Sequence, residues 1–515
     1  MQVENQDAVM AFLADPRTHG AGVRTVERVD THISALFLAG DRVYKLKRAV
    51  RFPYLDFSTA ARRRAVCEAE VALNRRTAPA LYLGVVAVTR EASGALALDG
   101  AGAPVDWLVV MRRFDQDTLF DRMAERGALD AQLMEALAAA IARFHRDAEI
   151  RRAAGGAAGL RRATDGNAKA FAEAPAGVFD AAKIERLVAA TERALDRVAP
   201  LLDARAAAGF VRLCHGDLHL RNICLYDGEP TLFDALEFDE ALASIDVLYD
   251  LAFLLMDLGY RGLDALASVT FNRYLEETED HGGLAALPLF LSSRAAIRAH
   301  VTASTIETAQ ADKRATLAAS ARRYLDLALD FLGPPKPRLV AVGGLSGTGK
   351  STLARALAPY VGPFPGAVVL RSDVIRKELA GVDRLTRLGA EGYSQDMSRR
   401  VYDTLRGRAA AILGAGHAAI ADAVYARPEE RAAIEAAARD AGATFAGFWL
   451  EAPAKALETR LAERSGDASD ATVAVLQRQR DYEIGAIDWH RVDAGGAPDA
   501  TLSRARALLG SATGH

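Results

Sequence analysis

The run Gly344–Ser351 (GLSGTGKS) constrains the fold of this chain more than any other stretch. It satisfies G-x-x-x-x-G-K-[ST], follows the apolar run 338–342 and precedes a helical pattern at 352–357. A strand that feeds a glycine-rich loop and then a helix points backbone N–H groups at a phosphate. Lys350 is expected to reach the β- and γ-phosphates, and the Ser351 hydroxyl to hold Mg²⁺. The motif therefore predicts binding of a nucleoside triphosphate.

The bulk properties of the sequence describe an ordinary globular protein. A length of 515 residues predicts two or three domains. A net charge of −3 gives no electrostatic basis for binding nucleic acid or a membrane surface. The three cysteines lack metal-ligand spacing and a disulfide pattern, which is typical of a reducing compartment. We therefore expect a cytoplasmic protein.

The segment 333–337 (GPPKP) is the sharpest boundary in the sequence. Its prolines cannot continue the helix that the apolar spacing predicts at 315–332. We expect one domain over residues 1–332 and a second over residues 338–515. A weaker break at 153–159, rich in Ala and Gly, is expected to be a surface loop of the first domain.

The first 110 residues predict mixed strands and helices. Runs 33–38 and 42–46 flank the turn signal Ala39-Gly40-Asp41 and predict a β-hairpin. Residues 58–76 predict a helix that starts at a Ser/Thr cap. From 119 onwards the pattern is mostly helical, except for short apolar runs between 212 and 238.

The segment 215–222 contains the pattern H-x-D-x-x-x-x-N, and Asp-x-x-x-x-Asn is the spacing of a kinase catalytic loop. In that arrangement Asp217 accepts or orients the proton of the attacking hydroxyl, and Asn222 turns back to ligate Mg²⁺. Asp234 ends an apolar strand twelve residues after Asn222 and is expected to be a second metal ligand. His215 is expected to hold the loop by hydrogen bonds.

An expected strand upstream carries Lys45 and Lys47 on one face, because strand side chains alternate with period two. Lys45 is expected to position phosphates. The following helix offers Glu70, with Glu68 as the alternative, as its ion-pair partner.

Residues 1–332 resemble the aminoglycoside phosphotransferase family of protein-kinase-like small-molecule kinases. The resemblance rests on the order Lys45, Glu70, Asp217, Asn222 and Asp234, and on a helix at 141–145 that ends in Phe-His. It implies a two-lobed fold, with an N-lobe over 1–110 and a C-lobe over 111–332, and ATP between the lobes. Gly216 precedes Asp217 and Ala235 follows Asp234, and both residues favour a small-molecule kinase over a regulated protein kinase. The sequence also lacks G-x-G-x-x-G before Lys45.

The second domain offers further acids at predicted strand ends, where ligands of doubly wound sheets bind. Asp373 ends the predicted strand 368–373 and is expected to be the base for a substrate hydroxyl, with a helix N-cap as the alternative. Arg376 is placed to grip the substrate or the transferring phosphoryl group. Asp422 ends the run 418–422 and is expected to assist Mg²⁺; no glutamate follows it, which favours transfer over hydrolysis.

Residues 338–512 resemble P-loop kinases grouped with gluconate kinase, chloramphenicol phosphotransferase, zeta-toxin and the polynucleotide kinase end-healing domain. This resemblance implies a doubly wound parallel sheet and a lid over 454–479, from which Arg464 reaches the phosphates. The residues expected at the phosphate cradle are Gly344, Ser346, Gly347, Thr348, Gly349, Lys350, Ser351 and Thr352. The two-part layout is similar to bacterial bifunctional aminoglycoside phosphotransferase/ATP-binding proteins.

The combined expectation is a two-domain kinase with α/β and α+β parts and two sites that bind ATP and Mg²⁺. Each site would transfer a phosphoryl group to the hydroxyl of a small molecule, with Asp217 as the base in the first site, and Asp373 and Arg464 as catalytic residues in the second. Two other classes stay open. One is a regulatory ATP-binding protein with a pseudokinase front domain, and the other is a polynucleotide 5′-hydroxyl kinase, which the low net charge disfavours.

Overall fold

The computed structural model describes residues 3–31, 33–52, 55–462 and 468–511. The chain forms two compact units, 1–160 with 202–257 and 161–201 with 258–515. The boundaries between them pass through α5 (Gly156–Ala172), α6 (Ala181–Ala208) and α8 (Val247–Tyr260). The division into residues 1–332 and 338–515 stays a prediction.

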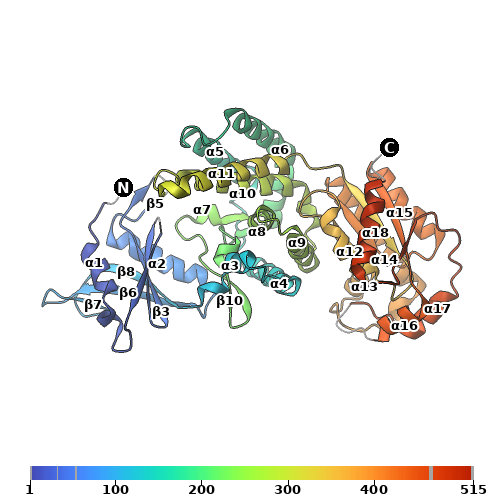
Figure 1. Cartoon of the computed structure of the whole chain (residues 1–515), viewed down its shortest axis with the longest axis horizontal. Helices are drawn as coiled ribbons and strands as arrows, with labels where there is room; N and C mark the ends of the chain where they lie inside the picture. The colour runs from blue at the N-terminus through green and yellow to red at the C-terminus, as the bar shows by residue number, and fades with distance from the viewer. Residues whose placement is uncertain (1–2, 32, 53–54, 463–467, 512–515) are drawn as a thin grey trace. The chain divides into compact units, whose positions relative to one another are not determined.

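The first unit begins with an antiparallel sheet whose described strands run in the order β1-β2-β3-β8-β6-β7 (Figure 1). The predicted hairpin is confirmed, because β2 and β3 pair through the turn at Gly40. The strands are β1 (Val26–Asp30), β2 (Ser34–Ala39), β3 (Arg42–Lys47), β6 (Tyr82–Arg90), β7 (Leu96–Leu98) and β8 (Ala103–Arg112).

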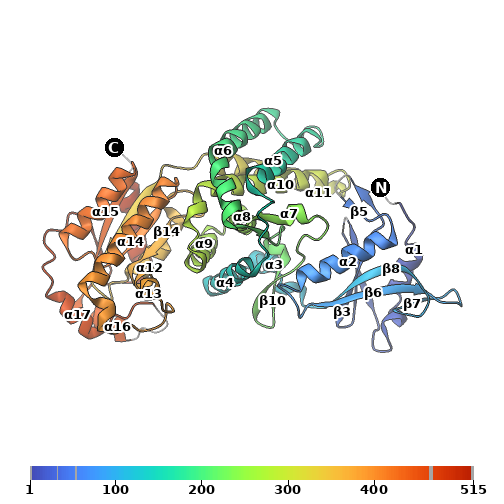
Figure 2. The ribbon, with the colours of Figure 1, turned by 180° about the vertical axis from the view of Figure 1, so that it is seen from behind.

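One helix covers each face of this sheet. On one face Leu13 of α1 (Asp7–Ala14) packs with Phe37 and Leu46. On the other face Val71 of α2 (Ala60–Asn74) packs with Val43 (Figure 2). The two apolar sets alternate along each strand, as period two requires. The predicted cap of α2 is also confirmed, because the Thr59 side chain accepts the N–H of Arg62.

The remainder of the first unit surrounds the segment 211–246 with helices. The apolar α8 supplies the core, with Leu248, Leu251 and Leu255 fully buried. The segment 212–238, an expected exception to the helical pattern, contains β10 and β11, which pair antiparallel. Strand β9, which overlaps the start of this segment, pairs antiparallel with β12. The elements are α3 (Phe120–Glu125), α4 (Ala131–Asp147), α7 (Glu240–Ala243), β4 (Arg51–Phe52), β5 (Leu55–Asp56), β9 (Val211–Leu213), β10 (Ile223–Tyr226), β11 (Glu229–Leu232) and β12 (Ser244–Asp246).

The second unit holds helices α9 (Asp264–Thr278), α10 (Leu287–Ser304) and α11 (Ala311–Phe331), together with a parallel sheet. The loop predicted at 153–159 is wrong in part, since α5 already begins at Gly156. Gly155 and Gly156 have φ of 67° and 61°, a backbone conformation that glycine adopts without strain and that lets the chain turn before the helix.

The parallel sheet has the described strand order β14-β15-β13-β16-β17, with helices on both faces. This confirms the doubly wound prediction. Leu353 of α12 and Leu509 of α18 pack on one face, and α14 and α15 lie on the other. The elements are β13 (Arg338–Gly343), α12 (Lys350–Leu357), β14 (Val368–Arg371), α13 (Ser372–Leu379), α14 (Gln395–Gly414), β15 (Ala419–Asp422), α15 (Pro428–Asp440), β16 (Thr444–Glu451), α16 (Ala454–Ala462), α17 (Val473–Arg480), β17 (His490–Asp493) and α18 (Pro498–Ser511).

None of the helices in the described part of the chain combines the length and the apolarity that crossing a membrane requires.

Candidate active sites

The first site is built around Lys45 on β3. Its Nζ lies 2.8 Å from Glu70 Oε1 and 2.6 Å from Asp234 Oδ1. Burial would lower the pKa of Lys45, but the carboxylates of Asp234 and Glu70 outweigh it and hold that pKa well above its usual value. Glu68 instead forms an exposed pair with Arg64. The structure thus places Glu70 at the partner position of the lysine.

A second lysine lies behind the first. Lys47 is fully buried and forms ion pairs with Glu70 and with Glu237. Glu70 therefore bridges two ammonium groups, and together they hold its pKa below its usual value although burial acts to raise it. Lys47 was expected on the strand face of Lys45 without a role of its own, and the contact with Glu237 was not predicted.

Helix α2 and strand β6 also fix the backbone at Asp234. Asp234 has φ of 60°, which is strained for a residue with a side chain. Its N–H donates to Tyr82 Oη at 3.1 Å, and the next N–H, of Ala235, donates to Asn74 Oδ1 at 2.8 Å. These bonds hold the Asp234 carboxylate, which is 42% exposed, toward Lys45.

The predicted catalytic loop brings Asp217 and Asn222 together. Asn222 Nδ2 donates to the carbonyl and to Oδ2 of Asp217, each at 2.9 Å. The Asn222 carbonyl in turn accepts the N–H of Phe233, the residue before Asp234. Burial and the Asp217 carboxylate act to raise the pKa of Asp234, but Lys45 outweighs them and the pKa stays below its usual value. All five predicted residues of the first site therefore lie in one cluster.

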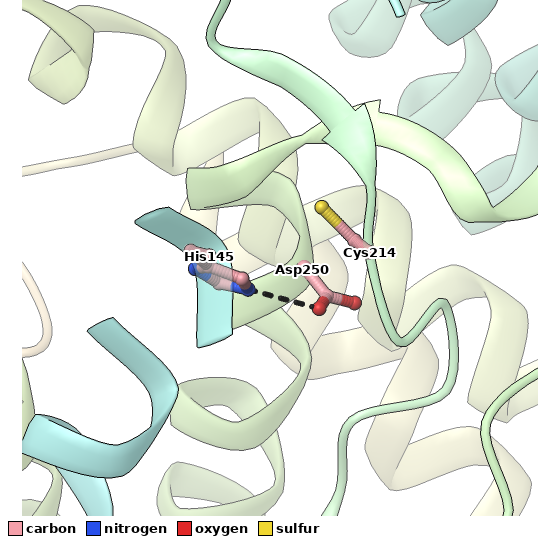
Figure 3. A group of neighbouring side chains, drawn as sticks. All are labelled: His145, Cys214 and Asp250. Carbon is pink, nitrogen blue, oxygen red and sulfur yellow. Dashed lines mark hydrogen bonds and ion pairs between the residues drawn. The ribbon is translucent and has the colours of Figure 1, made fainter. Parts of the chain in front are cut away.

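Asp250 of α8 anchors the loop, and Figure 3 shows it beside His145 and Cys214. Asp250 Oδ2 accepts the N–H of His215 at 3.0 Å, and Oδ1 accepts that of Gly216 at 2.9 Å. His145 of α4 also contacts Asp250 Oδ2, at 3.1 Å through Nε2. His145, Cys214 and Asp250 offer ligand atoms within 4.8 Å of one another. Because both Asp250 oxygens already accept backbone N–H groups, we interpret the group as a structural anchor.

His215 has the loop-holding contacts that the sequence analysis expected. Burial lowers the pKa of His215, so the ring is neutral near pH 7. Its Nε2 donates to the carbonyl of Phe233 at 3.0 Å, and Nδ1 accepts the N–H of Asp217 at 3.4 Å. His219 is buried too, with Nε2 3.4 Å from Asp217 Oδ2.

The second site lies at the carboxyl ends of β13, β14 and β15. The loop after β13 has three glycines with positive φ: Gly344 at 139°, Gly347 at 85° and Gly349 at 88°. A Cβ at Gly344 would lie 2.8 Å from the carbonyl of Leu450, so only glycine fits there. This loop leads directly into α12, whose first turn contains Lys350, Ser351 and the exposed Thr352.

Asp422 contacts the first turn of α12. Ser351 Oγ donates to Asp422 Oδ2 at 2.5 Å, and Lys350 Nζ donates to the carbonyl of Leu345 at 3.1 Å. Burial raises the pKa of Asp422, and Lys350 and Arg371 oppose that shift. Arg371, 3.7 Å from Asp422, was missed because a basic residue at a strand end carries no motif. Within the loop, Thr348 Oγ1 donates a hydrogen bond to the carbonyl of Leu345 at 2.8 Å.

Asp373 stands in the first turn of α13. The predicted strand is shorter than expected, because β14 ends at Arg371 and the helix starts at Ser372. No side chain caps α13, so the N-cap interpretation of Asp373 is wrong. Within the described ranges Asp373 makes no hydrogen bond or ion pair, which leaves its carboxylate available. Arg464 lies outside the described residues.

The ligand atoms at both sites are suited to Mg²⁺, which prefers oxygen. In the first site the Asn222 side chain forms its hydrogen bonds to other described groups through Nδ2, so its Oδ1 is available beside the carboxylate of Asp234, which is 42% exposed. In the second, Ser351 Oγ and Asp422 Oδ2 already converge.

A family model described as the phosphotransferase enzyme family matches residues 16–287. That is more than half of the chain, and it contains the whole first site. The chain belongs to the phosphotransferase enzyme family. A model described as an AAA domain matches residues 339–483, which hold the glycine-rich loop after β13. The two matches lie on either side of the proline-rich segment 333–337.

A relative is similar to this chain over nearly its whole length. The uncharacterized protein Rv2004c of Mycobacterium tuberculosis (strain ATCC 25618 / H37Rv) is 31% identical over 94% of this chain and 95% of its own length. Among solved structures, a sugar kinase from Janibacter sp. HTCC2649 is 21% identical, covering 34% of this chain and 95% of that one, with a TM-score of 0.26. A choline/ethanolamine kinase family protein from Mesorhizobium loti is 15% identical, covering 63% and 98%, with a TM-score of 0.35.

Proposed function

We propose that this chain transfers the γ-phosphoryl group of ATP to hydroxyl groups of small molecules at two separate sites. The observation that carries the proposal is the simultaneous pairing of Lys45 with Glu70 and Asp234, beside Asp217 and Asn222. The side chains of Asp217 and Asp234 are 40% and 42% exposed, although they lie next to a buried lysine. Carboxylates with a purely structural role would not be left exposed in this way.

In the first site Asp217 takes the proton of the acceptor hydroxyl, and Lys45 holds the phosphates. Asn222 and Asp234 would hold Mg²⁺. In the second site Lys350 and the loop amides hold the phosphates, Ser351 and Asp422 would hold Mg²⁺, and the unpaired Asp373 takes the acceptor proton. Bound Mg²⁺ supplies charge neutralisation of the phosphate oxygens at each site.

A phosphorylation screen with γ-labelled ATP and a metabolite pool tests the proposal on the full chain. Wild type, Asp217→Ala and Lys350→Ala are compared, with the exposed Lys336→Ala as the control for loss of a lysine. We expect one set of labelled products to disappear in Asp217→Ala and another in Lys350→Ala. Slow ATP turnover without any labelled acceptor would contradict the proposal and favour a regulatory nucleotide-binding protein.

A further inference from the structure

Strand β14 lies at the edge of the parallel sheet, with β15 as its neighbour among the described strands. The N–H of Val368 donates to the carbonyl of Ala418 at 2.9 Å, toward the sheet, so the next N–H, of Val369, points outward. Its acceptor is Oδ1 of Asn272 on α9, at 2.7 Å, and Nδ2 of the same side chain donates to the carbonyl of Ala367 at 3.1 Å. A side-chain amide offers one donor and one acceptor side by side, as a neighbouring strand does. Asn272 therefore takes the place of a further strand at this edge.

A second contact of α9 lies where the chain enters β14. The ring of Phe271 packs edge-on against the ring of His417, with ring centres 5.5 Å apart, and both residues are buried. Burial lowers the pKa of His417 to about 4, so the ring is neutral near pH 7 and its Nε2 donates to the carbonyl of Gly366 at 2.9 Å. Two consecutive residues of α9 thus hold the start of β14, one by packing and one by hydrogen bonds.

Beyond β14, ion pairs connect the end of α9 with the segment that contains α13 and α14. Glu276 Oε2 lies 3.1 Å from Arg384 Nη1, in the segment after α13. Glu279, which directly follows α9, places Oε2 2.9 Å from Arg408 Nη2. Arg408 of α14 also pairs with Glu378 of α13 at 2.6 Å. The contacts of α9 therefore extend along β14 to the helix that carries the proposed base of the second site.

We infer that Asn272 is a positioning residue of the second site, because it fixes β14 and through this strand the turn that carries Asp373. The inference rests on the proposed function of that site. Strand β14 ends at Arg371 and α13 begins at the next residue, so no loop lies between them to absorb a shift of the strand. Helix α9 precedes the proline-rich segment 333–337, whereas β14 follows it. The part of the chain before that segment thus helps to build the site of the part after it.

The test uses the full chain with Asn272→Leu, which keeps the branched shape of the side chain and removes both hydrogen bonds. The matched control is Asn167→Leu. Asn167 is a buried asparagine of α5 in the same unit, and its printed hydrogen bonds join Ser293 and His300 of α10, at 3.2 Å and 3.1 Å. Both variants lose buried hydrogen bonds, and Asn272→Leu alone loses bonds to β14.

The first measurement is hydrogen–deuterium exchange at the Val369 amide, relative to the Val340 amide of β13. Val340 lies between two paired strands, so the ratio of the two rates cancels a general loss of stability. We expect the ratio to rise roughly tenfold or more in Asn272→Leu, and to stay within about twofold of wild type in Asn167→Leu. An unchanged ratio in Asn272→Leu, or an equal rise in the control, would overturn the inference.

The second measurement separates positioning of the base from general damage to the site. It compares the affinity for a fluorescent ATP analogue with Mg²⁺, in a Lys45→Ala background that silences the first site, with the turnover of products whose labelling requires Lys350. The phosphate loop follows β13, so Asn272→Leu should keep the affinity within about twofold. Its turnover should fall roughly tenfold or more, since a small displacement of a catalytic group has effects of this size. Equal losses of affinity and turnover, or unchanged turnover, would count against a positioning role.

The variant Asn272→Ala guards against misfolding of the leucine variant. It leaves room for water to bond the exposed backbone groups of β14, so both measurements should change in the same direction by smaller factors. No change in either would contradict the inference. A wild-type chain that binds the ATP analogue and forms no product dependent on Lys350 would instead overturn the proposed function of the second site. The exchange ratio would then still show whether Asn272 holds β14.

Discussion

The backbone N–H of Ser346 donates to the side-chain oxygen of Gln479 at 2.8 Å, so helix α17 is bonded directly to the phosphate loop. Both residues are buried, with 7% and 6% exposed. On the same helix Leu476 packs with Leu457 and against Leu345 of the loop. The loop and α17 are therefore held together by one polar and one apolar contact.

Replacing Gln479 by Ala should destabilise the second unit, because the buried N–H of Ser346 loses its acceptor. The expected loss is about 1–3 kcal/mol. Calorimetric unfolding of the nucleotide-free full chain measures it. Gln477→Ala, at an exposed position of the same helix, is the control and should change stability by less than about 0.5 kcal/mol. Equal effects of the two substitutions would contradict a role for the Ser346 bond.

Replacing Glu70 by Gln should damage the first site far more than Glu68→Gln does. Glu70 lies between two buried ammonium groups, and breaking buried ion pairs costs roughly 3–5 kcal/mol. Glu68 pairs with Arg64 on the surface, where a pair contributes about 1 kcal/mol at most. Chemical denaturation and ATP-analogue binding to the first site, measured in a Lys350→Ala background, would show the difference. Similar losses in both variants would argue against the bridging role.

Asp250→Asn should loosen the catalytic loop. An amide accepts through a single oxygen, so it cannot accept from His215 and Gly216 through two oxygens as the carboxylate does. Hydrogen–deuterium exchange at these two amides should become faster by roughly tenfold or more, since hydrogen bonds to a charged group contribute about 1.5–3 kcal/mol. Unchanged exchange would show that the loop does not depend on Asp250.

The stabilising effect of Asp470 should depend on pH. Its Oδ2 accepts from Lys377 Nζ at 2.6 Å, from Tyr393 Oη at 2.7 Å and from the N–H of Leu388 at 3.0 Å. Burial acts to raise the pKa of Asp470, but these donors outweigh it and hold the pKa below its usual value of 3.8. A lowered folded-state pKa contributes stability that is fully present above the unfolded value and is lost as the pH falls through the folded one.

The Asp470→Asn variant should therefore be less stable than wild type at pH 7, by about 3 kcal/mol, because Lys377 is left buried without its anion. The difference should shrink as the pH is lowered from about 5 toward 3. Denaturation at several pH values, with the exposed Asp488→Asn as control, measures this. A difference that does not change with pH would show that the Asp470 charge is not the source.

Motifs with fixed spacing were sufficient to predict the two folds, and the residues predicted for the first site lie in one cluster. The glycine loop predicted the strand before it and the helix after it, and Asp217 and Asn222 lie together because five residues of loop return the chain to the same place. Those relations are local. The hairpin and the cap at Thr59 were predictable for the same reason.

The residues that were missed are joined by tertiary contacts alone. Gln479 is 133 positions from Ser346, and Glu237 is 190 positions from Lys47. No spacing rule connects such pairs, because their proximity follows from how helices pack on a sheet. Lys47 was the exception, since its two-residue separation from Lys45 placed both on one strand face.

Lys45 pairs with both Glu70 and Asp234, and this double pairing determines how Mg²⁺ and nucleotide can bind to the first site. Its ammonium is already paired with Asp234 Oδ1, so a divalent ion without nucleotide would have to displace the Lys45 ammonium from that carboxylate. The Lys45 ammonium can leave Asp234 at low free-energy cost only when another anion replaces that carboxylate. The phosphate oxygens of a bound nucleotide are such an anion. Mg²⁺ should therefore bind together with the nucleotide. Without nucleotide, the first site should bind Mg²⁺ only weakly.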